Sequence, residues 1–200
     1  KRYFPPEVKV ATDAIVLLVN KANKDTAMTF EKAVNVLRGG DTKYTLVFDK
    51  ANSGTSTYVL DLIGSSTMPK NAYAAKSNEE AINFVAQNPN AIAIIGYSWV
   101  ADSDDKMTRE TLKKLRVIHL TPREKEATLE YYTQHQLYIA QKRYPFTRDV
   151  YVIQRENRSG LSAGLTSFIY GDIGQIIMLK AGLLPATQYD RWLEMKVKPI

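Results

Sequence analysis

Apolar and polar positions alternate along this chain with two spacings, one typical of strands and the other of helices. Alternating or continuous apolar runs predict strands at residues 8–12, 14–19, 44–48, 91–95, 116–120 and 149–154. Apolar positions three and four apart predict helices that begin near residues 30, 54, 78, 161 and 172. Strands and helices in this order indicate an α/β fold, with a mainly parallel central sheet flanked by helices. The run at 91–95 is apolar throughout, which is typical of a strand buried on both faces of such a sheet.

Two helix starts carry a pair of residues at the spacing of a capping box. Ser77 and Glu80 form one pair, and Asp172 and Gln175 form the other. In each pair, the first side chain is expected to accept a hydrogen bond from a free N–H group of the first turn. In residues 121–143 the glutamates favour a helix, but the tyrosines and glutamines at 131–138 form no apolar stripe, so the type of element there is left open.

A short polar segment after the strand at 44–48 is the best candidate for a ligand site. Asn52, Ser53, Gly54, Thr55 and Ser56 lie where the next helix begins. The first N–H groups of a helix have no partner within it and carry about half a positive charge, so they attract phosphate, sulfate or carboxylate. Gly54 would let an anion approach the backbone, and the hydroxyl groups could add hydrogen bonds. The segment also suits an ordinary helix cap formed by Ser53 or Thr55, and taken alone it does not decide between the two interpretations.

Composition narrows the classes of protein to which the chain can belong. It has 200 residues, 44% of them hydrophobic, which suffices for one core of good size or for two small lobes. No apolar run approaches the ~20 residues that a membrane helix needs. The absence of cysteine excludes a disulfide framework, a thiolate zinc site and a cysteine nucleophile.

Charge and the remaining reactive side chains point to binding rather than catalysis. The formal charge of +6 suits an anionic partner, but the basic residues are scattered, and no nucleic-acid-binding pattern is present. His119 and His135 have no second ligand at metal-binding spacing, and Ser53 lies in no nucleophile elbow. We therefore expect neither a metal nor another cofactor, no nucleic-acid partner and no enzymatic activity.

Several segments, in the same order along the chain, resemble the phosphate-binding periplasmic proteins of ABC transporters. Residues 52–55 match the family's Ser-Gly-Thr anion loop, and residues 93–97 are similar to its Ile-Gly-Tyr strand end. The other matching segments are residues 11–20, 28–39, 144–148, 174–175 and 180–185. No segment is decisive alone, but the ordered set spans nearly the whole chain.

This resemblance implies a periplasmic-binding-protein fold of two lobes that close on an oxyanion without performing chemistry on it. Residues 8–145 would form the second lobe, and residues 146–200 would form the C-terminal portion of the first lobe. Closure would be a hinge motion about residues 8–12 and 144–148. The resemblance also implies a periplasmic or extracytoplasmic location, phosphate or a similar oxyanion as ligand, and a membrane ABC permease as partner. Whether a removed lipoprotein signal once supplied a membrane anchor is left open.

Two features depart from the family's pattern. The family has roughly a hundred more residues before the position of Val8, enough for a domain of ordinary size, and they form most of its first lobe. Without those neighbours, the last elements of this chain are expected to expose apolar surface, to pair with another copy or to be disordered. The second departure is Asp49, which stands where the family has an arginine, four residues before the loop serine. A carboxylate ~4 Å from an anion repels it by about 1 kcal/mol in water, where an arginine would attract it.

The resemblance also implies which residues hold the ligand: Ser53, Gly54 and Thr55, supported by Asn52 and Ser56. Two roles stay open for Asp49. It could accept a hydrogen bond from a protonated phosphate oxygen, or it could point away from the ligand and cap the next turn, which we favour. Lys50 or Arg38 could replace the missing positive charge, although each also suits a solvated surface position.

Residues after the strand at 91–95 could complete the site. Tyr97 and Ser98 follow the carboxyl end of that strand, where ligands of α/β proteins usually bind, whereas Trp99 is expected to fill the core. An alternative for the whole chain is that the fold serves a surface interaction or a different ligand. Asp49 is the residue that most favours this alternative.

Overall fold

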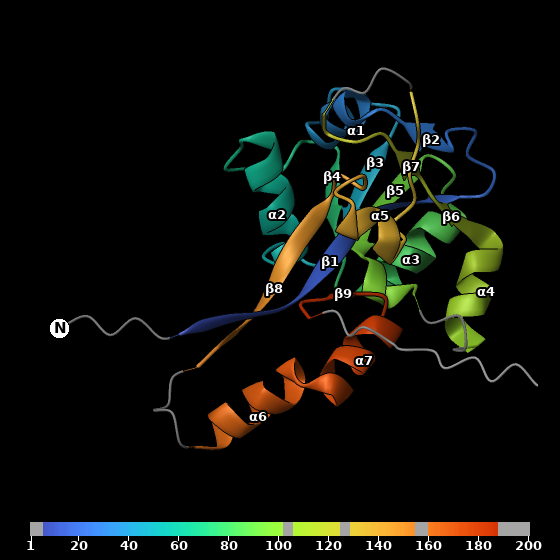
Figure 1. Ribbon diagram of the computed structural model, residues 1–200. Coiled ribbons are helices and arrows are strands. Elements are labelled where there is room, and N and C mark those ends of the chain that lie inside the picture. The colour runs from blue at the N-terminus through green and yellow to red at the C-terminus, as the bar shows by residue number, and fades with distance from the viewer. Residues whose placement is uncertain (1–5, 102–105, 125–128, 155–159, 188–200) are drawn as a thin grey trace, which may run out of the picture.

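One long strand, β1 (Glu7–Asn20), organises an α/β fold in the computed structural model, which describes residues 6–101, 106–124, 129–154 and 160–187 (Figure 1). The other strands are β2 (Ala27–Met28), β3 (Thr45–Phe48), β4 (Ala72–Ala74), β5 (Ala91–Gly96), β6 (Leu115–Val117), β7 (His119–Leu120), β8 (Thr147–Ile153) and β9 (Leu184–Pro185). The helices are α1 (Phe30–Leu37), α2 (Gly54–Ile63), α3 (Asn78–Gln87), α4 (Lys106–Lys114), α5 (Gln136–Ala140), α6 (Leu161–Tyr170) and α7 (Asp172–Lys180), with the 3₁₀ turn η1 (Tyr97–Trp99) after β5.

The main sheet is mixed, with the order β4-β3-β5-β1-β6. β4, β3 and β5 are parallel to one another, whereas β1 runs antiparallel to both β5 and β6. The predicted α/β class is confirmed, but the sheet is less parallel than expected because β1 reverses direction relative to its neighbours. The two strands predicted at 8–12 and 14–19 are one continuous strand, and the strand predicted at 116–120 is divided between β6 and β7.

Alternation along the strands places side chains in two apolar layers, one on each face of the sheet. Ile15 and Leu17 belong to the layer covered by α1 and α2, and Val16 and Leu18 belong to the layer covered by α3. In Figure 1, α2 lies to the left of the sheet, and α3 and α4 lie to its right. β5 is buried along its whole length, as its apolar run predicted.

One of the two predicted capping boxes forms in part, since Glu80 bonds the N–H of Lys76, one residue before the cap Ser77, and the other does not form. Ser77 Oγ accepts a hydrogen bond from the Glu80 N–H at 3.2 Å, and the Glu80 carboxylate accepts one from the Lys76 N–H at 2.7 Å. The prediction for Asp172 and Gln175 was wrong, because Gly171 precedes α7 as its cap and Asp172 is already its first helical residue. The buried amide of Gln175 instead donates to the Val10 carbonyl at 3.0 Å, which ties α7 to β1.

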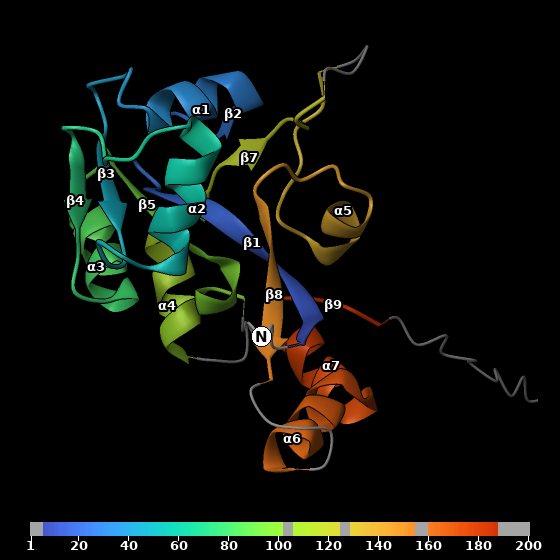
Figure 2. The same ribbon diagram turned by 90° about the vertical axis from the view of Figure 1, so that its left-hand side faces the viewer.

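β1 changes partners near its middle. Residues 7–14 pair with β8, whereas residues 15–20 pair with β5 and β6. α6 and α7 lie beside the first half of β1, at the end of the molecule away from α1 (Figures 1 and 2). β1 thus continues from the main sheet into the ladder that it forms with β8.

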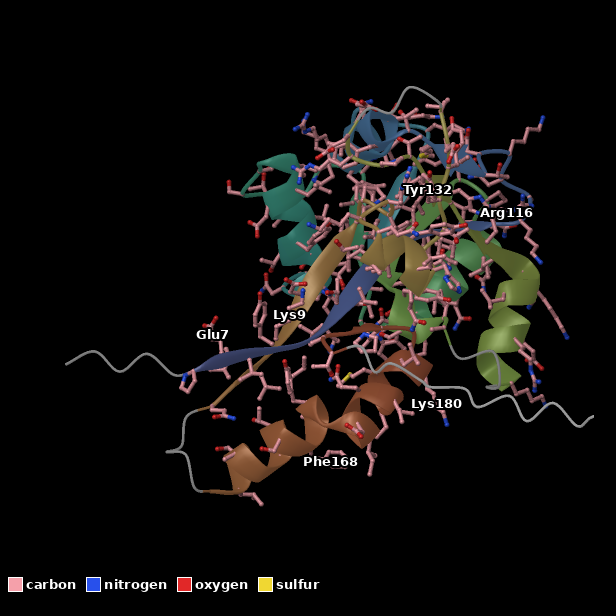
Figure 3. All side chains as sticks on the ribbon, in the orientation of Figure 1. Glu7, Lys9, Arg116, Tyr132, Phe168 and Lys180 are labelled. Atoms are coloured by element: carbon pink, nitrogen blue, oxygen red, sulfur yellow. The ribbon has the colours of Figure 1, made fainter. Side chains whose placement is uncertain are left out.

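The C-terminal helices expose apolar side chains, which is the first of the three outcomes expected for them. Phe168 and Lys180, labelled in Figure 3, lie in this part of the molecule. The large hydrophobic residues that α6 and α7 expose are Leu161, Leu165, Phe168, Tyr170, Ile173, Ile176, Ile177 and Leu179. Such a set exceeds the single exposed apolar residues that are normal on a protein surface.

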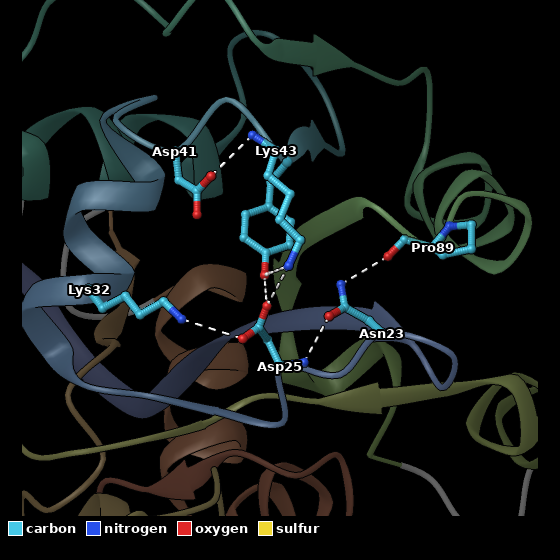
Figure 4. Close-up of polar contacts among 7 residues, drawn as sticks. Asn23, Asp25, Lys32, Asp41, Lys43 and Pro89 are labelled. Carbon is cyan, nitrogen blue, oxygen red and sulfur yellow. Dashed lines mark hydrogen bonds and ion pairs between the residues drawn. The ribbon is translucent and has the colours of Figure 1, made fainter.

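A polar network fixes the loop that follows β1 (Figure 4). The Asp25 carboxylate accepts hydrogen bonds from the Tyr44 hydroxyl and from Lys43 Nζ, the latter at 3.0 Å, and it pairs with Lys32. Asn23 Nδ2 donates to the Pro89 carbonyl at 2.9 Å. The hydrogen bond from Tyr44, followed by that from Lys43, lowers the pKa of Asp25 to about 2. The network joins the loop to the start of β3.

Candidate functional site

The predicted anion loop lies at the first turn of α2, next to the carboxyl ends of β3 and β5. Ser53 caps the helix, as predicted, and its Oγ accepts a hydrogen bond from the Ser56 N–H at 3.1 Å. Within the part of the chain that the structure describes, the N–H groups of Gly54 and Thr55 donate to no acceptor. These two donors and the positive end of the helix dipole are therefore free to meet an anion.

Asp49 is turned toward this helix start. The Ser53 hydroxyl donates to Asp49 Oδ1 at 2.5 Å, so the carboxylate helps to hold the turn that caps α2, in line with the capping role that we favoured. That Asp49 points away from a ligand stays a prediction. Because the single hydroxyl proton of Ser53 is directed at Asp49, it is not available to a ligand in this arrangement. The carboxylate also places a negative charge beside the positive end of α2.

The supporting residues of the loop differ in their orientation. Ser56 is buried, and its Oγ lies 3.0 Å from the Ala51 carbonyl and 2.9 Å from the Ser53 carbonyl, so it holds the loop in shape. Asn52 is exposed at the tip of the loop, and Thr55 is buried beneath it. The loop thus offers backbone N–H groups at its surface and hydroxyl groups mainly below it.

Asp13 and Arg148 meet at this helix start, although 135 residues separate them in sequence. They are opposite each other in the β1–β8 ladder, and Asp13 lies on the same face of β1 as Ile15 and Leu17, the face that α2 covers. Arg148 donates to Asp13 Oδ2 through Nε at 3.2 Å and through Nη2 at 2.9 Å. Its third nitrogen, Nη1, reaches Thr55 Oγ1 at 3.4 Å. A guanidinium group therefore stands beside the first turn of α2.

Two glycines make room for this pair. A Cβ atom added to Gly54 would lie 3.1 Å from Arg148 Nη1. A Cβ atom added to Gly96 would lie 2.9 Å from Asp13 Oδ2 and 3.3 Å from Arg148 Nη2. Such distances are below ordinary van der Waals contact, so any larger residue would displace one of the charged groups. The glycines of the Ser-Gly-Thr and Ile-Gly-Tyr segments thus flank the same arginine.

Burial shapes the electrostatics of the pair. Only 4% of the Asp13 side chain is exposed, compared with 29% of Arg148. Burial raises the pKa of Asp13, and Arg148 opposes this effect through its charge and its hydrogen bonds. The backbone N–H groups of Ala14 and Tyr97 add a smaller effect in the same direction as Arg148. Arg148 is consequently the group that makes a carboxylate tolerable at this buried position.

Tyr58, one turn further along α2, extends the polar environment of the site. Burial raises the pKa of Tyr58 to about 12, against smaller opposing effects from Arg123, from the Thr147 backbone and from Arg148. The tyrosine is therefore neutral near pH 7 and can act as a hydrogen-bond donor.

The sequence interpretation missed Arg148 as a site residue. It considered Lys50 and Arg38 for the missing positive charge, but Lys50 is exposed, and Arg38 donates to the Ile63 carbonyl at the far end of α2. A signal was present: Asp13 is a lone carboxylate within an apolar strand, and a buried carboxylate needs a cationic partner. What the sequence did not supply was the register that pairs β1 with β8.

The residues after β5 border the site only in part. The Tyr97 backbone lies beside Asp13, but its ring faces the end of α7, where a Cβ atom on Gly182 would approach it to 3.1 Å. Ser98 is exposed in η1. The expectation that Trp99 fills the core was wrong, because 49% of its surface is exposed. The 3₁₀ turn η1 directs the chain outward directly after β5.

Two negative findings apply to the residues described by the structure. No cluster of three or more His, Cys, Asp or Glu side chains among them is arranged to hold a metal ion. Within the same ranges, no helix combines the length and the apolar character needed to span a bilayer.

Comparison with known proteins places these features in context. A family model described as the PBP superfamily domain matches residues 6–170. No curated protein matches the sequence. Among solved structures, a phosphate ABC transporter substrate-binding protein from Clostridium perfringens, crystallised with phosphate, is 19% identical, with a TM-score of 0.69 over 91% of this chain and 72% of that one.

Two further structures have the same fold. An ABC-type phosphate transport receptor from Vibrio cholerae is 19% identical, with a TM-score of 0.66 over 92% of this chain and 74% of its own. PstS from Borrelia burgdorferi is 20% identical, with a TM-score of 0.61 over 90% of this chain and 72% of its own. At these identities the likeness establishes the fold, and the ligand has to be argued from the site itself.

Proposed function

The chain belongs to the PBP superfamily, and we propose that it is an extracytoplasmic solute-binding protein of an ABC import system that binds phosphate or a related oxyanion at the N-terminus of α2. It performs no chemistry on the ligand. The observation that carries this proposal is the convergence of free backbone N–H groups at Gly54 and Thr55 with the guanidinium group of Arg148. Each of these features attracts anions, and together they supply both direction and charge.

Each residue of the loop has a distinct part in this proposal. Gly54 and Thr55 donate their N–H groups to ligand oxygens, and Gly54 keeps the approach to the backbone open. Ser53 and Ser56 hold the loop in the conformation that presents those donors, and Asn52 closes over the ligand from the tip. Arg148 supplies the positive charge that the family places at position 49.

The lobe assignment gives a reason for closure. In this proposal, residues 8–145 form the second lobe, residues 146–200 belong to the first lobe, and the β1–β8 ladder is the hinge between them. A ligand shifts the equilibrium toward closure only if its contacts are better in the closed form. Arg148 lies on the hinge strand β8 and contacts α2, so an anion held by both would strengthen their association. A membrane permease would then receive the closed, loaded form.

Calorimetric titration of phosphate into the full-length protein, with sulfate as the control ion, tests the proposal. Saturable phosphate binding that the Arg148→Met variant strongly weakens would support it, and the melting temperature of that variant should fall because the buried Asp13 carboxylate loses its cationic partner. If neither ion binds, the fold serves another ligand or a protein partner. The Asp49 carboxylate, already hydrogen-bonded to Ser53 at the helix start, is the specific observation that favours this second candidate.

A further inference from the structure

We infer that Asp13 is a positioning residue for anion binding, because it holds Arg148 in the one orientation that directs a guanidinium nitrogen at the first turn of α2. This inference rests on the proposed function, since it assigns a role in the site where the oxyanion would bind. Asp13 does not reach the ligand in this role; it acts through Arg148.

The argument begins with the shape of the guanidinium group. Its five N–H donors lie in one plane, and Nε and Nη2 form one edge of that plane. Both of these nitrogens bind the same oxygen, Asp13 Oδ2, at 3.2 and 2.9 Å. Once that edge is occupied, the plane of the group is fixed, and Nη1 is the nitrogen left to face α2. Its 3.4 Å distance to Thr55 Oγ1 is the result of this orientation.

The rigidity of Asp13 is what makes it an effective support. Its side chain is 4% exposed and comes from the middle of β1, where the ladder with β8 fixes the backbone on both sides of the pair. An arginine side chain otherwise loses rotamer entropy when a ligand immobilises it. Holding Arg148 in place before the anion arrives removes that cost from binding, which is the general advantage of preorganisation.

Gly96 provides the space that this arrangement needs. β5 ends at Gly96, which is opposite Ile15 of β1, two residues after Asp13. A side chain at position 96 would enter the space of Asp13 Oδ2 and Arg148 Nη2. Three strands thus contribute to one guanidinium: β8 carries it, β1 orients it and β5 leaves room for it.

A neighbouring ion pair supplies a matched control. Asp149, next to Arg148 on β8, binds Lys9 at 2.6 Å and accepts a hydrogen bond from Thr12 at 2.9 Å. The side chains of Asp149, Lys9 and Thr12 span the same β1–β8 ladder. They lie on the opposite face from Asp13, because neighbouring strand residues point to opposite sides. Asp149→Asn therefore removes a carboxylate from the hinge ladder without touching Arg148.

The test is a double-mutant cycle on the phosphate dissociation constant, with Asp13→Asn, Arg148→Met and the double variant. We expect Asp13→Asn to weaken phosphate binding about tenfold, the size of a lost hydrogen bond to a charged group, and Asp149→Asn to change it less than about twofold. In the Arg148→Met background, Asp13→Asn should weaken binding no further, because Asp13 has no guanidinium group left to hold. The inference is overturned if Asp13→Asn weakens binding equally in both backgrounds, or if it leaves the affinity unchanged while Arg148→Met lowers it.

A second measurement does not depend on the ligand. The Arg148 Nε–H should give a distinct NMR resonance with slow solvent exchange in the wild-type protein and in Asp149→Asn, and should lose both properties in Asp13→Asn. An Arg148 signal that is the same in all three proteins would contradict the positioning role. If the wild-type protein binds no phosphate but shows the protected Nε–H, the proposed function fails while the orientation of Arg148 by Asp13 stands.

Discussion

Asp13 on β1 and Arg148 on β8 face each other across the ladder and form an ion pair of 2.9 Å at the first turn of α2. The pair brings a positive charge to the loop whose own sequence supplies a negative one at Asp49. In the proposed function, Arg148 takes the part that the resemblance gives to an arginine at position 49. The following predictions test separate parts of this site and of the fold around it.

Gly54→Asp should abolish phosphate binding with little loss of stability. The new carboxylate would sit at the positive end of α2, beside Arg148 Nη1, and would act as an internal anion. The free energy of unfolding should change by less than about 1 kcal/mol, because acidic residues suit the first turn of a helix. Calorimetric titration measures the phosphate affinity, and thermal unfolding measures the change in stability. Gly164→Asp is the matched control, since a Cβ atom there meets nothing within 4 Å; unchanged affinity in Gly54→Asp would refute the loop assignment.

Asp49→Asn should raise the affinity for phosphate about fivefold. The substitution removes ~1 kcal/mol of repulsion, the size expected for two unit charges at ~4 Å in water, and it weakens the hold on the Ser53 hydroxyl. Asp61→Asn, at the other end of α2, makes the same change in net charge and should leave the affinity nearly unchanged. Equal gains in both variants would indicate a general charge effect. A loss in Asp49→Asn alone would show that the carboxylate contacts the ligand.

Local sequence patterns predicted the elements well, whereas long-range pairing determined the site. The run at 91–95 and the residues 53–56 predicted β5 and the capped start of α2, because burial and capping act over a few neighbouring residues. Arg148 was missed because its role depends on pairing with Asp13, which no local rule specifies. Trp99 was misplaced for a related reason, since the direction of the chain after β5 depends on η1 and not on the hydrophobicity of the side chain.

Gly96→Ala should weaken phosphate binding about tenfold and also destabilise the protein. The added methyl group would press on Asp13 Oδ2, so the ion pair must shift, and overpacking of this kind typically costs about 1–3 kcal/mol. Thermal unfolding measures the loss of stability. Calorimetric titration measures the affinity for phosphate, which is compared with that of the wild type. Gly54→Ala adds the same methyl group against the flexible end of Arg148, where the spacing is 3.1 Å, and should be tolerated better. If Gly96→Ala binds phosphate like the wild type, the glycine does not protect the pair.

The stability of the loop after β1 should depend on pH through Asp25. Its pKa is about 2 in the folded protein, below its ordinary value of 3.8, because Tyr44 and Lys43 donate to it. The folded state therefore binds its proton less readily than the unfolded state, so the stabilisation is present above the ordinary pKa and is lost as the pH falls toward about 2. The difference in free energy of unfolding between the wild type and Asp25→Asn should be constant from about pH 5 to 7 and shrink below about pH 4.

Chemical denaturation at a series of pH values measures this difference. Tyr44→Phe removes the strongest of the hydrogen bonds to Asp25 and keeps the aromatic ring, so Asp25→Asn should have a smaller effect in that background, with a transition nearer pH 3.8. A difference between wild type and Asp25→Asn that persists undiminished to about pH 2 would mean that the carboxylate is not what stabilises the loop. The network lies beyond the C-terminal end of β1 and has no contact with Asp13 or Arg148 among the hydrogen bonds that fix it, so phosphate affinity should be the same in wild type, Asp25→Asn and Tyr44→Phe near pH 7.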